Sequence, residues 1–143
     1  MTQVSAAMAA ELHAGQELYR ELLAVIESEG RELREAGSQP PSGTAAAARQ
    51  ALLPRLNESL DILRRHRVSW TQASPEERAR HPQIAGLLRQ SQDLIMKIIV
   101  QDRENEQALL RRGLVPPQHL PSANRQRPHY VADLYRRQFG DGA

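Results

Sequence analysis

The segment from His81 to Gly113, HPQIAGLLRQSQDLIMKIIVQDRENEQALLRRG, constrains the fold more than any other part of the chain. Its apolar and small polar residues recur at alternating steps of three and four, which predicts one long helix buried along a seam against other helices. The seam comprises Ile84, Leu88, Ser91, Ile95, Ile98, Asp102, Asn105 and Leu109. At about 1.5 Å per residue this helix is roughly 46 Å long. We therefore expect an elongated bundle with a long outer surface and little enclosed space for a substrate.

The composition favours an all-α fold. Ala, Leu, Glu, Gln and Arg dominate the 143 residues, and runs of the β-branched and aromatic residues that favour strands are absent. Because only five residues are aromatic, the core must be aliphatic. We expect an elongated antiparallel helical bundle or coiled coil of three long helices, with a short C-terminal helix. The expected division is a bundle domain over residues 1–113 and a proline-containing tail over residues 114–143.

The same composition disfavours several classes of protein. The chain has no cysteine, so it has neither a disulfide framework nor a thiolate site. No apolar run reaches the roughly 18 residues of a membrane span, and the N-terminus lacks the basic segment of a secretory signal. We therefore expect a cytoplasmic protein without a membrane span. A formal net charge of +2 argues against a dedicated nucleic-acid binder.

A first helix is expected over about residues 2–36. Its heptad-like repeat is loose at Gly15 and at Glu29, where we expect a slight bend or a local gap in the packing. Together with the stripes of the later helices, this repeat predicts which residues are best buried. They are Leu22, Ile26, Leu56, Leu60, Leu63, Leu88, Ile95 and Ile98.

A second helix is expected from a cap at Thr44 to about Val68, where Trp70 closes it or packs under the next loop. Pro54 lies inside this range, and a proline within a helix costs about 3 kcal/mol. Either the helix kinks near the proline, or it begins there. We favour a continuous, kinked helix because the alanines after Thr44 are strong helix formers.

The sequence Ser74-Pro75-Glu76-Glu77 marks another helix start. Ser74 fits the cap position, proline suits the first turn, and Glu77 completes a capping box. Pro82 interrupts soon afterwards, so we expect a short helix over residues 75–80, followed by the long helix. The long helix should stop at Gly113, because two prolines follow at 116 and 117.

The chain contains no recognised catalytic or metal-binding motif. None of its five histidines belongs to a Glu-x-x-His pair, and there is no His-Glu-x-x-His, phosphate-binding glycine loop or Gly-x-Ser-x-Gly. His13 and Glu17 are one helical turn apart and could touch a metal, although such a pair is more often a solvated helix face. We expect no enzyme activity, no metal and no cofactor.

The polar residues of the long seam are candidates for function. Ser91, Asp102 and Asn105 should face neighbouring helices. One interpretation is that the bundle splays at this end and admits water. The other is that a partner helix fills a groove there, since buried polar groups can fix the register of packed helices. The candidate partner-binding residues of this helix are Ile95, Ile98, Asp102, Asn105 and Leu109.

The tail contains a short amphipathic element at residues 129–139. Such a segment is too short to be stable alone in water, so it must dock on the bundle or on a partner. Four prolines between residues 116 and 128 could hold it away from the bundle; alternatively, it covers the apolar seam of the bundle. Its candidate partner-binding residues are Tyr130, Leu134, Tyr135 and Phe139, because tyrosine is enriched at binding hot spots.

Basic charge gathers late in the chain, from the end of the long helix onward. Six arginines and one acid, Asp133, lie between Arg111 and Arg137, with two tyrosines interleaved. Such a segment could contact the phosphates and bases of a nucleic acid. The charge density is low over this length, however, so we expect a protein partner and no nucleic acid. Whether copies of the chain form a homo-oligomer is left open.

The chain resembles the FlgN-type flagellar export chaperones, small helical proteins of the cytosol. The resemblance covers about residues 5–113. It rests on the first helix from Glu17-Leu18 through Leu33-Arg34, on ALLPRLNESLDILRRH at residues 51–66 and on QDRENEQALLRRG at residues 101–113. Pro54 and the segment from Trp70 to His81 depart from the family pattern.

The resemblance implies a chaperone of type III secretion. Such a protein binds a C-terminal helical segment of hook-associated (filament-junction) flagellar proteins and delivers them to the export gate. In the family, a C-terminal segment that carries a tyrosine is associated with docking at the gate, and Tyr130 and Tyr135 are the candidates here. The alternative is a structural or regulatory helical-bundle protein that binds a partner coiled coil and is unrelated to secretion.

Overall fold

The described part of the chain is all-α. The structure is a computed structural model that describes residues 6–35, 43–111 and 131–140, and in these residues it has five helices and no strand. The helices are α1 (Ala6–Glu35), α2 (Thr44–Gln72), α3 (Pro75–Arg80), α4 (Pro82–Arg111) and α6 (Val131–Phe139). The expected helical bundle is confirmed. None of the described helices is long and apolar enough to cross a membrane.

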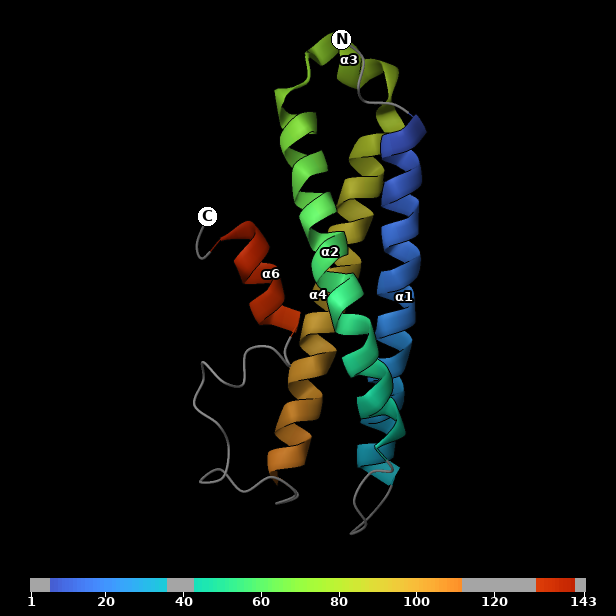
Figure 1. Ribbon diagram of the computed structural model, residues 1–143, viewed down its shortest axis with the longest axis vertical. Coiled ribbons are helices and arrows are strands. Elements are labelled where there is room, and N and C mark those ends of the chain that lie inside the picture. The colour runs from blue at the N-terminus through green and yellow to red at the C-terminus, as the bar shows by residue number, and fades with distance from the viewer. Residues whose placement is uncertain (1–5, 36–42, 112–130, 141–143) are drawn as a thin grey trace.

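Three long helices lie side by side, and α2 runs in the opposite direction to α1 and α4 (Figure 1). The hydrogen bond from the Gln16 amide to Ser91 Oγ (3.2 Å) and that from the Asn105 amide to the Ile26 carbonyl (2.8 Å) show that α1 and α4 run in parallel. Helix α1 packs against both α2 and α4, while α6 packs against α2 and α4 from the other side. The short α6 therefore takes the fourth position around the core.

The core is aliphatic, as expected. Of the eight residues predicted to be best buried, all but Leu88 are buried. Leu88 is only half-buried, and Leu87 is buried in its place. The two positions suit a helical seam equally well by spacing. On the buried side of α4 the Leu87 carbonyl accepts a hydrogen bond from the Gln16 amide of α1 (3.0 Å), in addition to one from Ser91 Oγ of its own helix (2.8 Å).

Helix α2 differs from the prediction at both ends. It passes Pro54 without a break, which confirms the continuous helix, but the residue in the cap position is Gly43 rather than Thr44. Gly43 has a φ of 88°, a left-handed conformation that glycine adopts without strain. At the other end the helix continues to Gln72. Its last carbonyls have partners there, since the Ala73 N–H bonds to the Trp70 carbonyl and the Arg78 guanidinium to the Thr71 carbonyl.

The turn into α4 follows its local sequence closely. Ser74 is the cap of α3, and its Oγ accepts a hydrogen bond from the Glu77 N–H at 3.1 Å. Pro75 occupies the first turn, and the helix ends at Arg80 as predicted. Trp70 is half-buried and packs against the core cluster. The expected stop at Gly113 lies outside the described residues.

Helix α6 lies on the bundle. Val131 is fully buried and Leu134 is 6% exposed, and both belong to the hydrophobic core cluster. The sequence left two alternatives for this segment: it covers the apolar seam of the bundle, or the prolines hold it away. In the structure the described part of the segment covers the seam. His129, Tyr130 and the four prolines of the tail lie outside the described residues.

Replacing Ile95 by alanine should lower the free energy of unfolding by about 2–5 kcal/mol, because the side chain is fully buried between the long helices. The Asp93→Ala variant is the control, since Asp93 is exposed on the same helix and should change stability by less than about 0.5 kcal/mol. Urea unfolding followed by circular dichroism measures both. Equal midpoints for the two variants would show that the seam is wrongly assigned.

Deleting residues 126–143 should destabilise the protein, because it removes Val131 and Leu134 from the core and exposes the apolar side chains of α2 and α4 that α6 covers. A loss of about 2 kcal/mol or more is expected from the burial of two aliphatic side chains. Thermal unfolding and light scattering would measure the loss and any aggregation. An unchanged melting temperature would mean that α6 contributes nothing to the fold.

Candidate functional site

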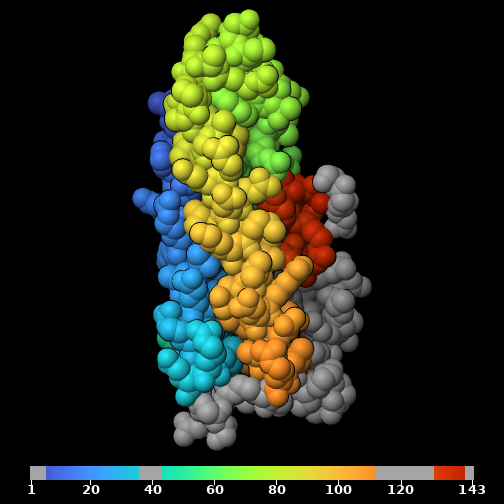
Figure 2. Space-filling model, turned by 180° about the vertical axis from the view of Figure 1, so that it is seen from behind, coloured from blue at the N-terminus to red at the C-terminus, as the bar shows by residue number. Residues whose placement is uncertain are grey.

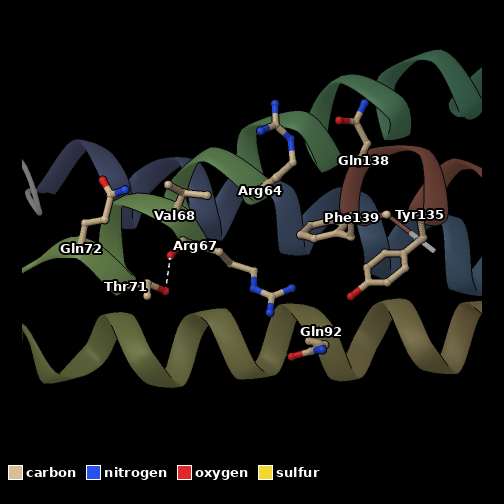
Figure 3. A pocket seen from close by; sticks show the side chains of 10 residues that line it. Arg64, Arg67, Val68, Thr71, Gln72, Gln92, Tyr135, Gln138 and Phe139 are labelled. Atoms are coloured by element: carbon tan, nitrogen blue, oxygen red, sulfur yellow. Dashed lines mark hydrogen bonds between the residues drawn. The ribbon is translucent and has the colours of Figure 1, made fainter. Parts of the chain in front are cut away.

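A hollow of about 480 Å³ lies between α2, α4 and the C-terminal end of α6 (Figure 3). We call it the α6-end groove. Helix α2 supplies half of the lining residues, α6 closes one end, and Gln92 of α4 lies opposite α2. The lining residues of α2 and α6 are Arg64, Arg67, Val68, Thr71, Gln72, Tyr135, Gln138 and Phe139, with Gly140 at the end of α6.

Two aromatic rings and one guanidinium form the closed end of the groove. The rings of Tyr135 and Phe139 are stacked with their centroids 4.5 Å apart. The Arg67 guanidinium lies 5.1 Å from the centroid of the Phe139 ring, within the range of a cation–π contact. Figure 3 shows this guanidinium in the space between α2 and α4. The groove thus combines a flat apolar wall with a positive charge.

Arg67 is the arginine of the groove that is available for a partner. Arg64 and Arg65 both pair with Asp61, at 2.7 Å and 2.8 Å, and the hydrogen bond from Arg64 lowers the pKa of this exposed carboxyl. No carboxylate in the described residues forms an ion pair with Arg67. Val68, the next residue, is 47% exposed, an unusual environment for a large aliphatic side chain in this protein.

A buried polar cluster joins the helices at the other end of α6. Arg49 Nη1 lies 2.9 Å from Asp102 Oδ1 and 3.4 Å from Glu29 Oε1, so one guanidinium serves two buried carboxylates. The Asn105 amide donates to Glu29 Oε1 at 3.3 Å. The remaining oxygen of Asp102 accepts the N–H of Val131 at 3.4 Å. The cluster therefore connects α1, α2, α4 and the start of α6.

Burial dominates the electrostatics of this cluster. Removal from water raises the pKa of Glu29 and that of Asp102, although Arg49 lowers both in part. The cluster also requires close packing. A Cβ on Gly30 would lie 2.7 Å from Asn105 Oδ1 and 2.9 Å from Gln101 Nε2, so a side chain at this position would have to displace these two side chains of α4. The cluster therefore has the form of a structural contact that holds the helices together.

The structure divides the predicted partner-binding residues into three groups. Ile95 and Ile98 are fully buried in the core, and Leu134 faces the bundle. Asp102 and Asn105 belong to the buried polar cluster, so the end of the seam neither splays nor forms an open groove within the described residues. Leu109 is half-buried near the end of α4.

The aromatic residues of the tail separate in the same way. Tyr135 and Phe139 line the α6-end groove, whereas Tyr130 lies outside the described residues. The sequence interpretation missed Arg67 and Val68 on α2. A signal was present, because Arg64, Arg67, Val68 and Thr71 are spaced i, i+3, i+4 and i+7 and must share one helix face.

The described residues contain no candidate metal site. No group of three or more His, Cys, Asp or Glu side chains among them could hold a metal ion. His13 and Glu17 are both exposed on α1. His66 instead contacts Glu11, with its Nε2 2.8 Å from a carboxylate oxygen. No family model, curated protein or solved structure matches this chain.

The raised carboxyl pKa values predict how stability depends on pH. The folded protein binds a proton at Glu29 more tightly than the unfolded chain does. In the unfolded chain the pKa of Glu29 is near the ordinary 4.5. The contribution of this group to the free energy of unfolding therefore increases as the pH falls through the raised pKa toward 4.5, and it is lost as the pH rises. Glu29→Gln should remove this contribution and flatten the pH profile.

The measurement is urea unfolding of both proteins between pH 7.5 and pH 4.5. Glu17→Gln is the control, because Glu17 is exposed on the same helix and should leave the profile of the parent unchanged. A parent profile that does not differ from that of Glu29→Gln would show that Glu29 has an ordinary pKa in the folded state.

Proposed function

We propose that the protein binds an amphipathic helical segment of a protein partner in the α6-end groove. One observation carries the proposal: α6 fills the space between α2 and α4 only as far as Phe139, and the hollow there has an exposed aliphatic side chain and an arginine without an ion pair among the described residues. A groove that has an apolar wall and is bordered by helices suits an amphipathic helical ligand.

The direction of α6 defines where the ligand lies. The N-terminus of α6 contacts Asp102, whereas Tyr135 and Phe139 reach the level of Gln92, so α6 runs antiparallel to α4. The stretch of α4 from Pro82 to Gln92 remains beyond it. This stretch is about 15 Å long, which corresponds to roughly three turns of a ligand helix placed in line with α6.

The chemistry of the groove specifies the ligand. Apolar side chains on one face of the ligand helix would cover Val68 and the ring of Phe139. A carboxylate on the same helix would pair with Arg67, and such charge-assisted hydrogen bonds are stronger than neutral ones. A segment that is disordered when free would gain its helical structure on binding, as is common for amphipathic recognition segments.

The flagellar export chaperone implied by the family resemblance is one form of this proposal. The ligand would then be the C-terminal helical segment of a hook-associated protein. Tyr135, which lines the groove, would be a candidate for docking the chaperone at the export gate. The resemblance also implies that the three long helices form an antiparallel coiled coil. A structural or regulatory protein that binds a partner coiled coil would use the same groove with a different ligand.

Binding can be tested with fluorescein-labelled peptides and anisotropy. The probes are C-terminal segments of hook-associated proteins, a designed amphipathic helix with acidic residues on its polar face, and the same helix with lysines instead. We expect the acidic helix to bind and Arg67→Glu to weaken its binding at least tenfold, which is about 1.4 kcal/mol. Arg65→Glu is the matched control, because Arg65 is exposed on α2 outside the groove.

The outcomes separate the alternatives. Tight binding of a hook-associated segment supports the export chaperone, whereas binding of the designed acidic helix alone supports the more general helix-binding protein. If no peptide binds, or if Arg67→Glu and Arg65→Glu weaken binding equally, the groove is not the binding site and the proposal is wrong.

A further inference from the structure

A second hollow lies on the other side of α4, between α4 and α1. It has a volume of about 390 Å³ and is lined by Leu23 and Glu27 of α1 and by Met96, Lys97, Val100 and Gln101 of α4. Figure 2 shows this face, with α1 on one side of α4 and α6 on the other. The hollow is therefore separate from the α6-end groove, and both can be occupied at once.

This hollow concentrates exposed apolar surface. In the described part of the chain, the large hydrophobic side chains that are exposed are Val68, Met96 and Val100. Val68 belongs to the α6-end groove, whereas Met96 and Val100, 46% and 53% exposed, lie one turn apart in the second hollow. Leu23, half-buried, extends the same apolar surface onto α1. The centre of the α1/α4 face is thus apolar, and it is suited to contact another protein.

Two opposite charges border the apolar centre. Glu27 and Lys97 are both exposed, and neither forms an ion pair within the described residues. Lys97 is the single lysine of the chain. Gly30 of α1 lies between the levels of Gln101 and Asn105 of α4, so Glu27 and Lys97 stand within about one helical turn of each other along the bundle. One acid and one base therefore flank the hollow from opposite sides.

This arrangement is complementary to itself. A two-fold axis along the bundle would place α1 of one copy opposite α4 of another at the same level, because α1 and α4 are parallel. Glu27 would then lie within about one turn of Lys97 of the other copy, which two long side chains can span, and the same pair would form a second time. Met96, Val100 and Leu23 would pack between the two ion pairs.

We propose that a second copy of this chain docks on the α1/α4 face to form a symmetric dimer. The face is large enough, since two helices about 45 Å long and about 10 Å wide each offer roughly 900 Å². A standard protein interface buries about 800 Å² on each partner. The α6-end grooves remain open on the outer sides of such a dimer, so this inference does not depend on the proposed function.

The test is the mass of the full chain in solution, measured by size-exclusion chromatography with light scattering at 10–200 µM. We expect twice the 16.1 kDa of one chain. Glu27→Lys and Lys97→Glu should each raise the dissociation constant of the dimer at least tenfold, because each creates two pairs of like charges. The double variant, with the charges exchanged, should restore the dimer.

Two controls make the result specific. Glu21→Lys makes the same change of charge on α1, but Glu21 faces Arg55 of α2, so this variant should remain dimeric. Carbodiimide treatment of a mixture of unlabelled and ¹⁵N-labelled chains should join Lys97 of one copy to Glu27 of another, and mass spectrometry would detect the mixed peptide pair. Circular dichroism checks that each variant is folded.

A wild-type mass of one chain throughout this concentration range would overturn the proposal. So would a dimer that withstands both single charge reversals, or one that the double variant does not restore. If the wild-type chain is monomeric and Lys97→Glu instead abolishes capture of a different protein, the face belongs to that protein and the proposal is again wrong.

Discussion

One guanidinium joins the helices of this protein. Arg49 extends from α2 to Glu29 of α1 and to Asp102 of α4, and the second oxygen of Asp102 accepts the first N–H of α6. Charges removed from water are costly unless they are paired, so sliding any of the three long helices by one turn would leave a buried charge without its partner. The cluster therefore fixes the register of the bundle, whereas the aliphatic core around it supplies most of the stability.

With the register fixed, the two sides of α4 acquire different surfaces. On one side α6 covers the aliphatic floor between α2 and α4 but ends at Phe139, and the remaining space is the α6-end groove with Arg67 and Val68. On the other side α1 and α4 approach closely at Gly30 and leave Met96 and Val100 exposed. Both surfaces are built on rigid helices, so each can present its side chains without prior ordering.

Local patterns in the sequence were sufficient for the helices but not for their polar contacts. The aliphatic repeat predicts α1, α2 and α4, and the run from Ser74 to Glu77 predicts the start of α3 to the residue. The spacing of α4 does not distinguish Leu87 from Leu88, because the side that faces α1 is defined by contacts with residues far away in sequence, such as Gln16, which is 71 residues from Leu87. The role of Arg49 could not be predicted either, because an arginine followed by a glutamine on a helix resembles a solvated position. At Gly15 and Glu29, where the loose repeat predicted a slight bend or a packing gap, the structure has polar contacts instead: the Tyr19 hydroxyl and Ser59 Oγ are 2.9 Å apart beside Gly15, and Glu29 pairs with Arg49.

The parallel course of α1 and α4 has an electrostatic consequence. Each helix behaves as a macrodipole with roughly half a positive charge at its N-terminus and half a negative charge at its C-terminus. Both N-termini lie at the α3 end of the rod, together with the single C-terminus of α2 (Figure 1). The helix backbones alone therefore leave this end positive. The C-terminus of α6, with its half negative charge, lies at the closed end of the α6-end groove. Along the groove the helix dipoles therefore run from negative at α6 to positive at the α3 end, and they orient a bound acidic segment with its carboxylates away from α6.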